Sequence, residues 1–253
     1  EGGGKISGVV TERGTIGCSA VVLAGGAWSN LFCGLYGIDL PQLKVLNTVI
    51  RTKPLQGGPE AALWSKDFAI RKRQDGGYTI ASGHENIVDI VPKSFRYARQ
   101  FLPALKLEWN SLSFRLGGRF FDEARIPAKW KMDEASPFEY HRVLDPKPSL
   151  DLSNRFFDSL KAAFPVFNQA EIAQRWAGYI DATPDAIPVI SAVDEIPGFH
   201  IATGFSGHGF GIGPAAGRLM ADIVTGRAPV VDAAAFRFSR FSDGSKITPI
   251  TGF

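Results

Sequence analysis

The stretch TGFSGHGFGIG, Thr203 to Gly213, carries five glycines in eleven residues. The apolar run Phe199 to Thr203 predicts a strand before it, and Gly213 to Thr225 predicts a helix after it. Glycine loses more conformational entropy than any other residue when a loop becomes ordered, so this cluster indicates positive φ angles or a ligand close to the backbone. A helix beginning near Ile212 would offer free N–H groups to an anionic ligand.

A flexible surface loop is the alternative interpretation of this turn, because Gly-rich turns also occur without ligands. The nearest nucleotide-binding pattern, formed by Gly211, Gly213 and Ala216, contains Pro214. Too little chain follows it for the rest of a βαβ unit. The pattern therefore excludes a self-contained dinucleotide-binding fold around this turn.

The composition is that of an ordinary globular protein. The 253 residues suffice for one large or two ordinary domains, with 45% hydrophobic and 21% charged residues. The 28 basic and 25 acidic residues give a net charge of +3 and are scattered, so nucleic-acid binding is not indicated. No apolar run reaches the roughly 20 residues of a membrane span, and no signal peptide is recognised. We therefore expect a cytoplasmic protein.

The two cysteines, Cys18 and Cys33, are expected to be reduced and to act as small hydrophobic residues. They form no disulfide framework, and their spacing is not that of metal ligands. We therefore predict no metal site.

The strand patterns predict two kinds of sheet. Lys5 to Thr11 and Thr15 to Cys18 predict a hairpin, and Ala20 to Ala24 is a continuous apolar run typical of a buried parallel strand. From Leu43 onward the pattern favours an antiparallel sheet, with further strands predicted at Lys44 to Lys53, Phe68 to Arg73, Tyr78 to Ser82 and Glu171 to Ile180.

Helices are predicted between and after these strands. Leu152, Phe156, Leu160 and Phe164 share one face of a predicted helix, Ser149 to Phe164. The other predicted helices are Ser94 to Leu102, Ser111 to Glu123, and a short one that Ser29 caps and Gly37 ends. The fold class is therefore α+β, with an antiparallel block inserted between two pieces of an α/β sheet.

Three separated segments resemble one protein family. They are VVLAGGAWSN (Val21 to Asn30), RWAGYIDATPDAIPVI (Arg175 to Ile190) and PGFHIATGFSGHGFGIGPAAGRLMADIVTG (Pro197 to Gly226). In this order they resemble the D-amino-acid oxidase-like flavoproteins, a family that includes sarcosine oxidase, glycine oxidase and D-amino-acid dehydrogenases.

The resemblance implies a domain organisation. Residues 1–40 would form part of an FAD-binding domain, residues 41–176 an inserted antiparallel substrate domain, and residues 177–253 the return to the FAD-binding domain with a C-terminal tail. The family's N-terminal Gly-x-Gly-x-x-Gly unit is missing. The chain thus resembles the C-terminal portion of such an enzyme, and we expect a missing N-terminal segment or a partner chain to carry that unit.

The resemblance also implies FAD as the cofactor and a set of residues around it. Gly25, Gly26 and Ala27 would pass close to the flavin and Trp28 would pack beside it, although Trp28 fits a core aromatic equally well. The loop after the C-terminal strand would run along the flavin, with its N–H groups facing the pyrimidine edge, where hydride uptake places negative charge. These loop residues are Gly204, Phe205, Ser206, Gly207, His208, Gly209, Phe210, Gly211 and Ile212.

No catalytic residue is identified by the sequence. His84 and His208 are retained as pocket candidates, although half of the side chains on a strand face away from any pocket and His208 favours a structural or flavin-adjacent role. Tyr78, Tyr140 and His141 have weaker claims. Asp185 is expected to be a turn and capping residue.

The chain departs from the family at three functional positions. Gly178 stands where sarcosine oxidases carry the cysteine that binds flavin, so we expect non-covalent FAD. Ile180 and Gly211 replace the arginine of glycine oxidase and the lysine of sarcosine oxidases that bind substrate carboxylates. Other arginines, namely Arg51, Arg115 and Arg119, could supply this charge, and nothing in the sequence selects one.

The function expected from the resemblance is oxidation of a C–N bond of an amine or amino acid by hydride transfer to flavin. The alternative is a non-catalytic binding or assembly subunit that completes its flavin site with a separate chain. A fragment without independent activity is a third possibility. Hydride transfer of this kind depends on the positioning of the substrate more than on a particular acid or base. The absence of the family's two carboxylate-binding residues therefore does not change the expected reaction class.

Overall fold

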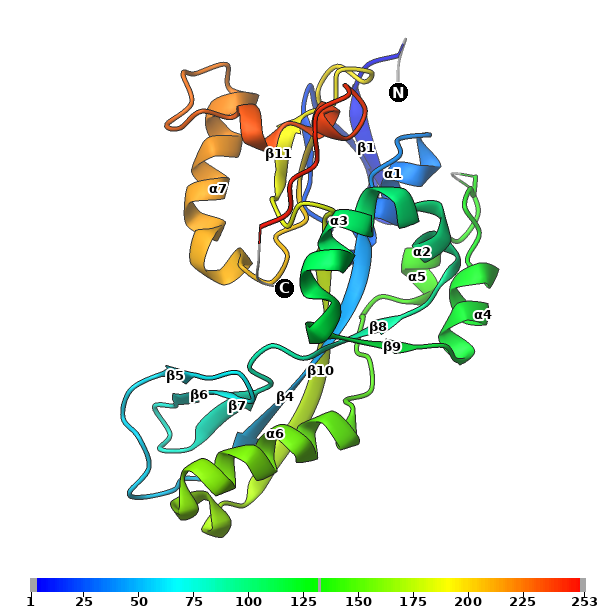
Figure 1. Cartoon of the computed structure of the whole chain (residues 1–253). Helices are drawn as coiled ribbons and strands as arrows, with labels where there is room; N and C mark the ends of the chain where they lie inside the picture. Colours follow the sequence, from blue (N-terminus) through cyan, green and yellow to red (C-terminus); the bar gives the residue numbers. More distant parts are fainter. Residues whose placement is uncertain (1–3, 132, 251–253) are drawn as a thin grey trace.

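The computed structural model describes residues 4–131 and 133–250. In Figure 1 a small sheet lies at one end of the molecule and the outer strands of a large sheet lie at the other. Two long strands of the large sheet run between these ends. These two strands are β4 (Leu43–Thr52) and β10 (Ile172–Ala182), which pair antiparallel along most of their lengths. The fold is thus mixed α and β, as predicted.

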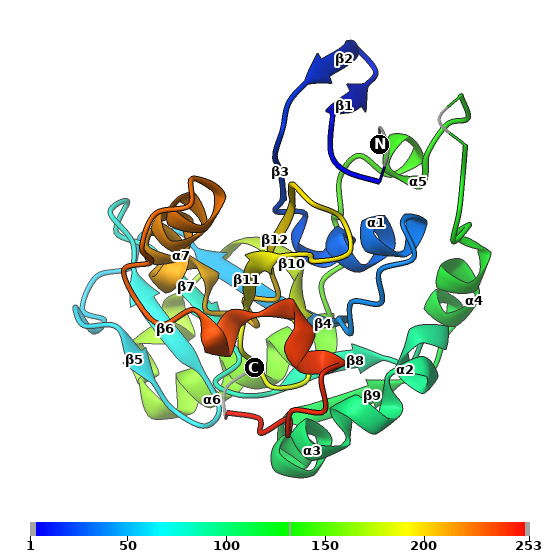
Figure 2. The same cartoon turned by 90° about the horizontal axis from the view of Figure 1, so that it is seen from above.

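The small sheet has three strands in the described chain, in the order β11 (Val189–Ala192), β12 (Phe199–Thr203) and β3 (Val21–Leu23). β12 runs parallel to β3 and antiparallel to β11. The apolar run at Ala20 to Ala24 is therefore the parallel strand that its pattern predicts. The hairpin of β1 (Gly8–Thr11) and β2 (Gly14–Gly17) projects from this end of the molecule (Figure 2).

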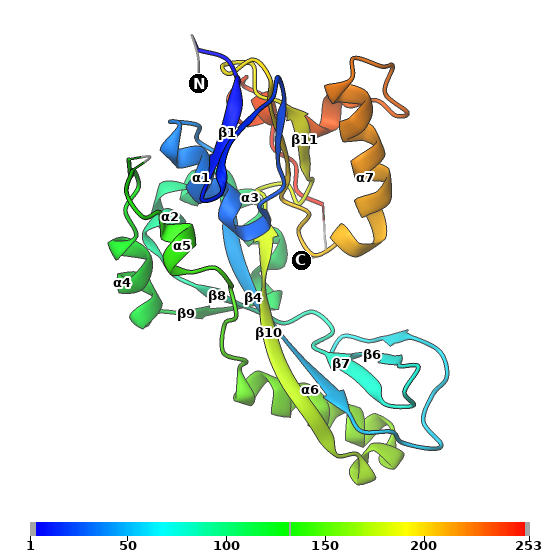
Figure 3. The ribbon, with the colours of Figure 1, turned by 180° about the vertical axis from the view of Figure 1, so that it is seen from behind.

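The large sheet contains seven of the described strands. In space, β4 lies between β10 on one side and β7 (Tyr78–Ala81) and β8 (Asn86–Asp89) on the other. β5 (Leu63–Trp64) and β6 (Ala69–Lys72) extend the sheet beyond β7, and β9 (Leu112–Arg115) pairs parallel to β8. Figure 3 shows β4 and β10 running from the small sheet to the far end, where β6 and β7 lie.

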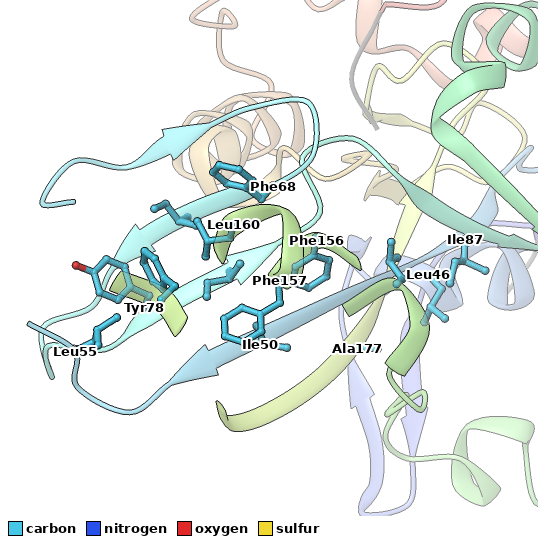
Figure 4. Close-up of a cluster of buried hydrophobic side chains, with 14 residues drawn as sticks. Leu46, Ile50, Leu55, Phe68, Tyr78, Ile87, Phe156, Phe157, Leu160 and Ala177 are labelled. Carbon is cyan, nitrogen blue, oxygen red and sulfur yellow. The ribbon is translucent and has the colours of Figure 1, made fainter. Parts of the chain in front are cut away.

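The main core lies between the large sheet and α6 (Leu150–Ala163). The Ser149 hydroxyl accepts a hydrogen bond from the Leu152 N–H at 3.3 Å and so caps this helix. Leu152, Phe156 and Leu160 are buried on one face of the helix, as their spacing predicts. Figure 4 shows Phe156 and Leu160 packed against side chains of the sheet.

The other helices lie around the two sheets (Figures 1 and 2). α7 (Gly209–Val224) packs on the small sheet through Ala216, Leu219 and Met220. On the other side lie α1 (Ser29–Leu35), α2 (Pro92–Arg96), α3 (Ala98–Glu108), α4 (Gly118–Arg125) and α5 (Pro137–Tyr140). Short 3-10 segments occur at Gly26–Trp28, Trp109–Ser111, Pro165–Gln169, Ala234–Phe236 and Phe238–Phe241.

Four local predictions were wrong in part. The helix predicted over Ser94 to Leu102 is divided between α2 and α3, which meet at Tyr97. The helix predicted over Ser111 to Glu123 is divided, because Leu112–Arg115 pairs with β8 as a strand and only Gly118–Arg125 is helical. Helix α7 begins at Gly209, four residues before the predicted Gly213, with Pro214 inside it. Ser29 is the first helical residue of α1 rather than its cap, and its side chain makes no capping bond.

Candidate functional site

Two glycine-rich turns meet at one edge of the small sheet. β3 and β12 are parallel neighbours, so the turns that follow them leave from the same edge. The Thr203 hydroxyl at the end of β12 donates a hydrogen bond to the Gly26 carbonyl at 3.2 Å. The structure thus brings together Gly25–Trp28 and Gly204–Ile212, the two groups of residues predicted to lie beside a cofactor.

The end of β10 fixes the second turn. One carboxylate oxygen of Asp181 accepts the Gly204 N–H at 2.7 Å and the Thr203 hydroxyl at 3.1 Å. The Asp181 carbonyl accepts the Ser206 N–H at 3.3 Å. Burial raises the pKa of Asp181, while these hydrogen bonds act against that rise. A single aspartate therefore sets the path of the chain as it leaves β12.

The backbone of this turn needs its glycines at particular positions. Gly204 has a φ of 75° and Gly207 one of 88°, both in the left-handed region. A Cβ on Gly204 would lie 2.3 Å from the Thr183 methyl carbon. Ser206 adopts a φ of 49° without being glycine, and its buried hydroxyl accepts the Thr183 N–H at 3.3 Å. The turn is therefore held in one strained conformation rather than being a loose surface loop.

The outer side of the turn presents unused hydrogen-bond donors. The N–H groups of Gly207, Gly209 and Phe210 have no partner among the described residues. They lie at the N-terminus of α7, where the helix dipole favours negative charge. The His208 side chain beside them is exposed, and Phe210 is fully exposed. This arrangement can receive an anionic or electron-rich edge of a ligand.

The first turn contains an orphaned polar atom. Ser29 Oγ is the one buried side-chain oxygen or nitrogen with no hydrogen-bond partner across residues 4–131 and 133–250. A Cβ on Gly25 would lie 3.2 Å from it. Gly26 has a φ of 52°, so the chain turns here in a conformation that favours glycine. The hydroxyl and the N–H groups of the second turn suit a cofactor rich in acceptors, as FAD is.

Trp28 packs against protein. Its ring meets Phe138 edge to face, with centroids 6.0 Å apart. The observed contact is thus the one expected of a packing aromatic. Ala27 is half-buried and lines one end of a cavity between α1 and α4.

Asp185 holds a turn, as predicted from its place after proline. Asp185 Oδ1 accepts the Ile187 N–H at 3.2 Å. Both carboxylate oxygens also bind Arg240, at 2.7 and 3.1 Å, and both side chains of this pair are buried. A carboxylate that already binds a guanidinium stabilises the fold and is not available for proton transfer.

The other predicted pocket residues are dispersed. His84 lies in the connection between β7 and β8, where its ring contacts the Lys66 carbonyl. Tyr78 is fully buried in the main core, and its hydroxyl donates to the Pro59 carbonyl at 3.2 Å. Figure 4 shows the Tyr78 ring within that core.

The three candidate arginines all have partners. Arg51 donates to Gln174, Arg115 binds Asp89 through two nitrogens, and Arg119 binds Glu123 at 2.7 Å. The guanidinium of Arg119 also lies 4.1 Å from the centroid of the Tyr179 ring. Arg115 and Arg119 are therefore engaged by carboxylates, whereas Arg51 has only a neutral amide partner.

Sequence reasoning missed two residues that organise the site, Asp181 and Gln42. Gln42 is buried, donates to Thr203 Oγ1 at 3.1 Å and to Asp181 Oδ2 at 3.3 Å, and accepts the Asn30 N–H at 3.1 Å. Asp181, a half-buried aspartate four residues before Asp185, belongs to no recognisable sequence motif. Only the pairing of β4 with β10 brings it to Gly204.

The mixed α and β fold, with its large mainly antiparallel sheet and its small sheet with a parallel strand pair, matches the fold of solved amino-acid oxidases and deaminases. Residues 1–223 match the model of the DAO family, described as FAD dependent oxidoreductase, and the chain belongs to this family.

Relatives and solved structures give the same assignment. The chain is 25% identical over 242 residues to a D-amino acid dehydrogenase of Bradyrhizobium diazoefficiens, covering 95% of this chain and 44% of the relative. It is 25% identical to a glycine oxidase of Pseudomonas aeruginosa, covering 92% of this chain and 49% of the relative. An L-amino acid deaminase from Proteus myxofaciens, solved in complex with anthranilate, superposes with a TM-score of 0.91 at 38% identity, over 96% of this chain and 54% of that one.

The chain spans about half the length of the relatives it matches. No helix in the described part of the chain is long and apolar enough to cross a membrane.

Proposed function

We propose that this chain forms the C-terminal portion of an FAD-dependent enzyme that oxidises the C–N bond of an amino acid. The observation that carries the proposal is the turn Gly204–Phe210, which the half-buried Asp181 holds in place and whose N–H groups at Gly207, Gly209 and Phe210 lack partners among the described residues. FAD, when bound, supplies the acceptor for the hydride that leaves the substrate carbon.

The chain's own residues act by holding the cofactor edge and its charge. Preorganised N–H dipoles cost no reorganisation when negative charge develops beside them. The hydrogen bond from Gly204 to Asp181 and the left-handed turns at Gly204, Ser206 and Gly207 keep these dipoles in place. Gly178 stands where a flavin-binding cysteine would be needed, which supports non-covalent FAD.

The substrate class follows from the names of the relatives, which are a D-amino acid dehydrogenase, a glycine oxidase and an L-amino acid deaminase. All three names refer to amino acids, and they differ in the hand of the substrate. Removal of two electrons and two protons turns the amine into an imine, which water can hydrolyse to an oxo acid. We propose an amino-acid substrate of either hand, with His208, which lies in the glycine turn, as the remaining pocket candidate.

We further propose that polypeptide outside these 253 residues supplies the pyrophosphate-binding unit. The sequence holds no Gly-x-Gly-x-x-Gly pattern, and its relatives are about twice as long. Two arrangements would supply that unit, the same polypeptide or a separate chain, and they differ in whether one reading frame encodes both parts.

The first experiment is a visible absorption spectrum. The chain is incubated with FAD, separated from free cofactor and scanned, and the longest product of its reading frame is treated in parallel. Flavin that stays with the protein and is bleached by amino acids in the absence of oxygen supports the proposal.

Two results would contradict the proposal. One is a reading-frame product, with any co-purifying chain, that retains no flavin. The other is a flavin-loaded protein that no D- or L-amino acid bleaches. A matched control is Gly217→Ala, which lies on α7 away from the turn with open space around its added Cβ and should keep both properties.

A further inference from the structure

The cavity that Ala27 lines lies between α1, α2 and α4, apart from the turn Gly204–Phe210. Its volume is about 440 Å³. None of the residues from Gly204 to Ile212 lines it, and it shares with the candidate cofactor site only Ala27 and the supporting residue Gln42. We propose that this cavity, called here the α1–α4 cavity, binds a small carboxylate with an apolar body, and that the ammonium group of Lys93 pairs with the carboxylate.

The charges around the α1–α4 cavity are unbalanced. Five basic side chains and three acidic ones line it. The acidic ones are already paired within the protein, Asp39 with Arg96, Asp89 with Arg115 and Arg119, and Glu123 with Lys44 and Arg119. The two basic residues left over are Lys93 and Lys129. The cavity therefore carries a surplus of positive charge.

Lys93 is the inner of these two residues. Its side chain is partly buried at the start of α2, whereas Lys129 is exposed. Lys93 Nζ donates to the side-chain oxygen of Asn30, and no carboxylate among the described residues lies within ion-pair distance of it. A shielded ammonium bound only to a neutral amide lacks the counter-charge that normally offsets its desolvation. An anion in the cavity would supply this counter-charge.

The charged and titratable groups around Lys93 do not supply the missing counter-charge. Burial, followed by the cations Lys44 and Arg96, lowers the pKa of Lys93 to about 8, against the opposing effects of Glu123 and Cys33. Burial raises the pKa of the Cys33 thiol to about 12, so Cys33 is neutral and offers no negative charge. A bound carboxylate would raise the pKa of Lys93 again.

The lining also indicates the body of the ligand. Apolar side chains from four elements and their connections face the same space, namely Leu31, Ile38, Leu43, Val91 and Ile126. A phosphate or a polycarboxylate would have to bury further negative charges beside them without partners. A monocarboxylate with an aliphatic or aromatic body would pair its one negative charge with Lys93 and place its apolar body against the apolar side chains.

A buried hydrogen-bond network links this cavity to the glycine turn. Asn30, which accepts from Lys93, donates its N–H to Gln42, and Gln42 donates to Asp181, the residue that holds Gly204. The Asn30 side-chain amide also donates to Tyr97 Oη at 2.9 Å. A ligand in the α1–α4 cavity would therefore be connected to the glycine turn through this series of hydrogen-bonded side chains.

The test is isothermal titration calorimetry of the 253-residue chain with phenylacetate and with phenylacetamide, its uncharged analogue. The variants are Lys93→Met and, as a control, Lys106→Met, which removes an exposed lysine on α3 with the same change in net charge. We expect phenylacetate to bind about tenfold or more tightly than phenylacetamide, because a charge-assisted hydrogen bond is lost with the amide. Lys93→Met should abolish that preference and Lys106→Met should keep it.

Three results would overturn the proposal. These are equal binding of acid and amide, an acid preference that survives in Lys93→Met, and binding of inorganic phosphate as tightly as phenylacetate. The affinity for phenylacetate should also fall as the pH rises through about 8, where Lys93 loses its charge. The test needs no flavin, so its outcome is independent of the proposed enzymatic function.

Amine labelling provides a second measurement if Lys93→Met does not fold. Acetic anhydride acylates free amines, and peptide mass spectrometry gives the rate at each lysine of the unmodified protein. Phenylacetate should slow the labelling of Lys93 several-fold and leave that of Lys106 unchanged. Equal rates at Lys93 with and without phenylacetate would contradict the proposal.

Discussion

The carboxylate of Asp181 accepts the N–H of Gly204 at 2.7 Å, at the residue where the chain leaves β12 with a φ of 75°. This contact joins the end of a long strand of the large sheet to the turn of the small one. It requires both a backbone conformation that only glycine adopts readily and a half-buried carboxylate acceptor. Each requirement can be tested separately.

Gly204→Ala should destabilise the protein by about 1–3 kcal/mol, since alanine must adopt a left-handed conformation there and its Cβ would collide with Thr183. The measurement is urea unfolding followed by circular dichroism. Gly217→Ala is the matched control and should stabilise the protein by about 0.5–1 kcal/mol, because it replaces glycine inside a helix with space around it. Equal effects of the two substitutions would refute the role assigned to Gly204.

Asp181→Asn should change how stability depends on pH. The folded pKa of Asp181 is raised, so its carboxyl favours folding most when protonated. That contribution is fully present below the ordinary aspartate pKa of about 4 and is lost as the pH rises through the folded pKa. Asparagine keeps the acceptor for the Gly204 N–H but cannot ionise. The stability of the variant should therefore lack this decline with rising pH.

The measurement for Asp181→Asn is the free energy of unfolding at several pH values from about 4 to neutrality. Asp194→Asn, at an exposed turn position, is the control and should retain the decline of the unmodified protein. An unchanged pH dependence in Asp181→Asn would show that its carboxyl is not perturbed by folding.

Arg240→Met should cost about 3–5 kcal/mol, because it leaves the buried carboxylate of Asp185 without its guanidinium partner. The control is Arg237→Met, whose pair with Asp243 is considerably more exposed, so its loss should change stability far less. Thermal unfolding of the two variants under identical conditions compares them. A loss at Arg240 as small as that at Arg237 would contradict the importance given to burial.

Phe210→Ala should leave the free energy of unfolding within about 0.5 kcal/mol of the original, since the side chain is fully exposed. If the proposed cofactor site is right, the same change should weaken FAD binding severalfold, through loss of ring contacts worth about 0.5–1.5 kcal/mol. FAD fluorescence titration measures it in the flavin-binding form of the protein. Phe121→Ala, on exposed α4 surface, should alter neither property.

Local patterns predicted much of the fold. The spacing of Leu152, Phe156 and Leu160 predicted α6, and the turn after Arg73 predicted the hairpin of β6 and β7. Strand β9 was missed because a run of four residues has no strong period, and its structure depends on β8, more than twenty residues away in sequence. Pairing with β8 therefore determined the structure of this segment, although its local pattern favoured a helix.

The candidate site was predictable only where glycine marked it. The turns at Gly25 and Gly204 were found from composition and resemblance, and the structure brings them together. Asp181, Gln42 and Lys93 were not found, because their importance comes from partners elsewhere in the chain. A side chain whose role depends on such contacts has no local signal in one sequence.

The hydrogen bond between Thr203 and Gly26 joins residues 177 positions apart. Contacts between such distant residues close a long loop, which costs entropy before any contact compensates for it, and they form slowly during folding. During synthesis, Gly26 leaves the ribosome long before Thr203 does. The two glycine turns can therefore meet only after Thr203 has left the ribosome, so a cofactor that contacts both turns could be bound only after that point.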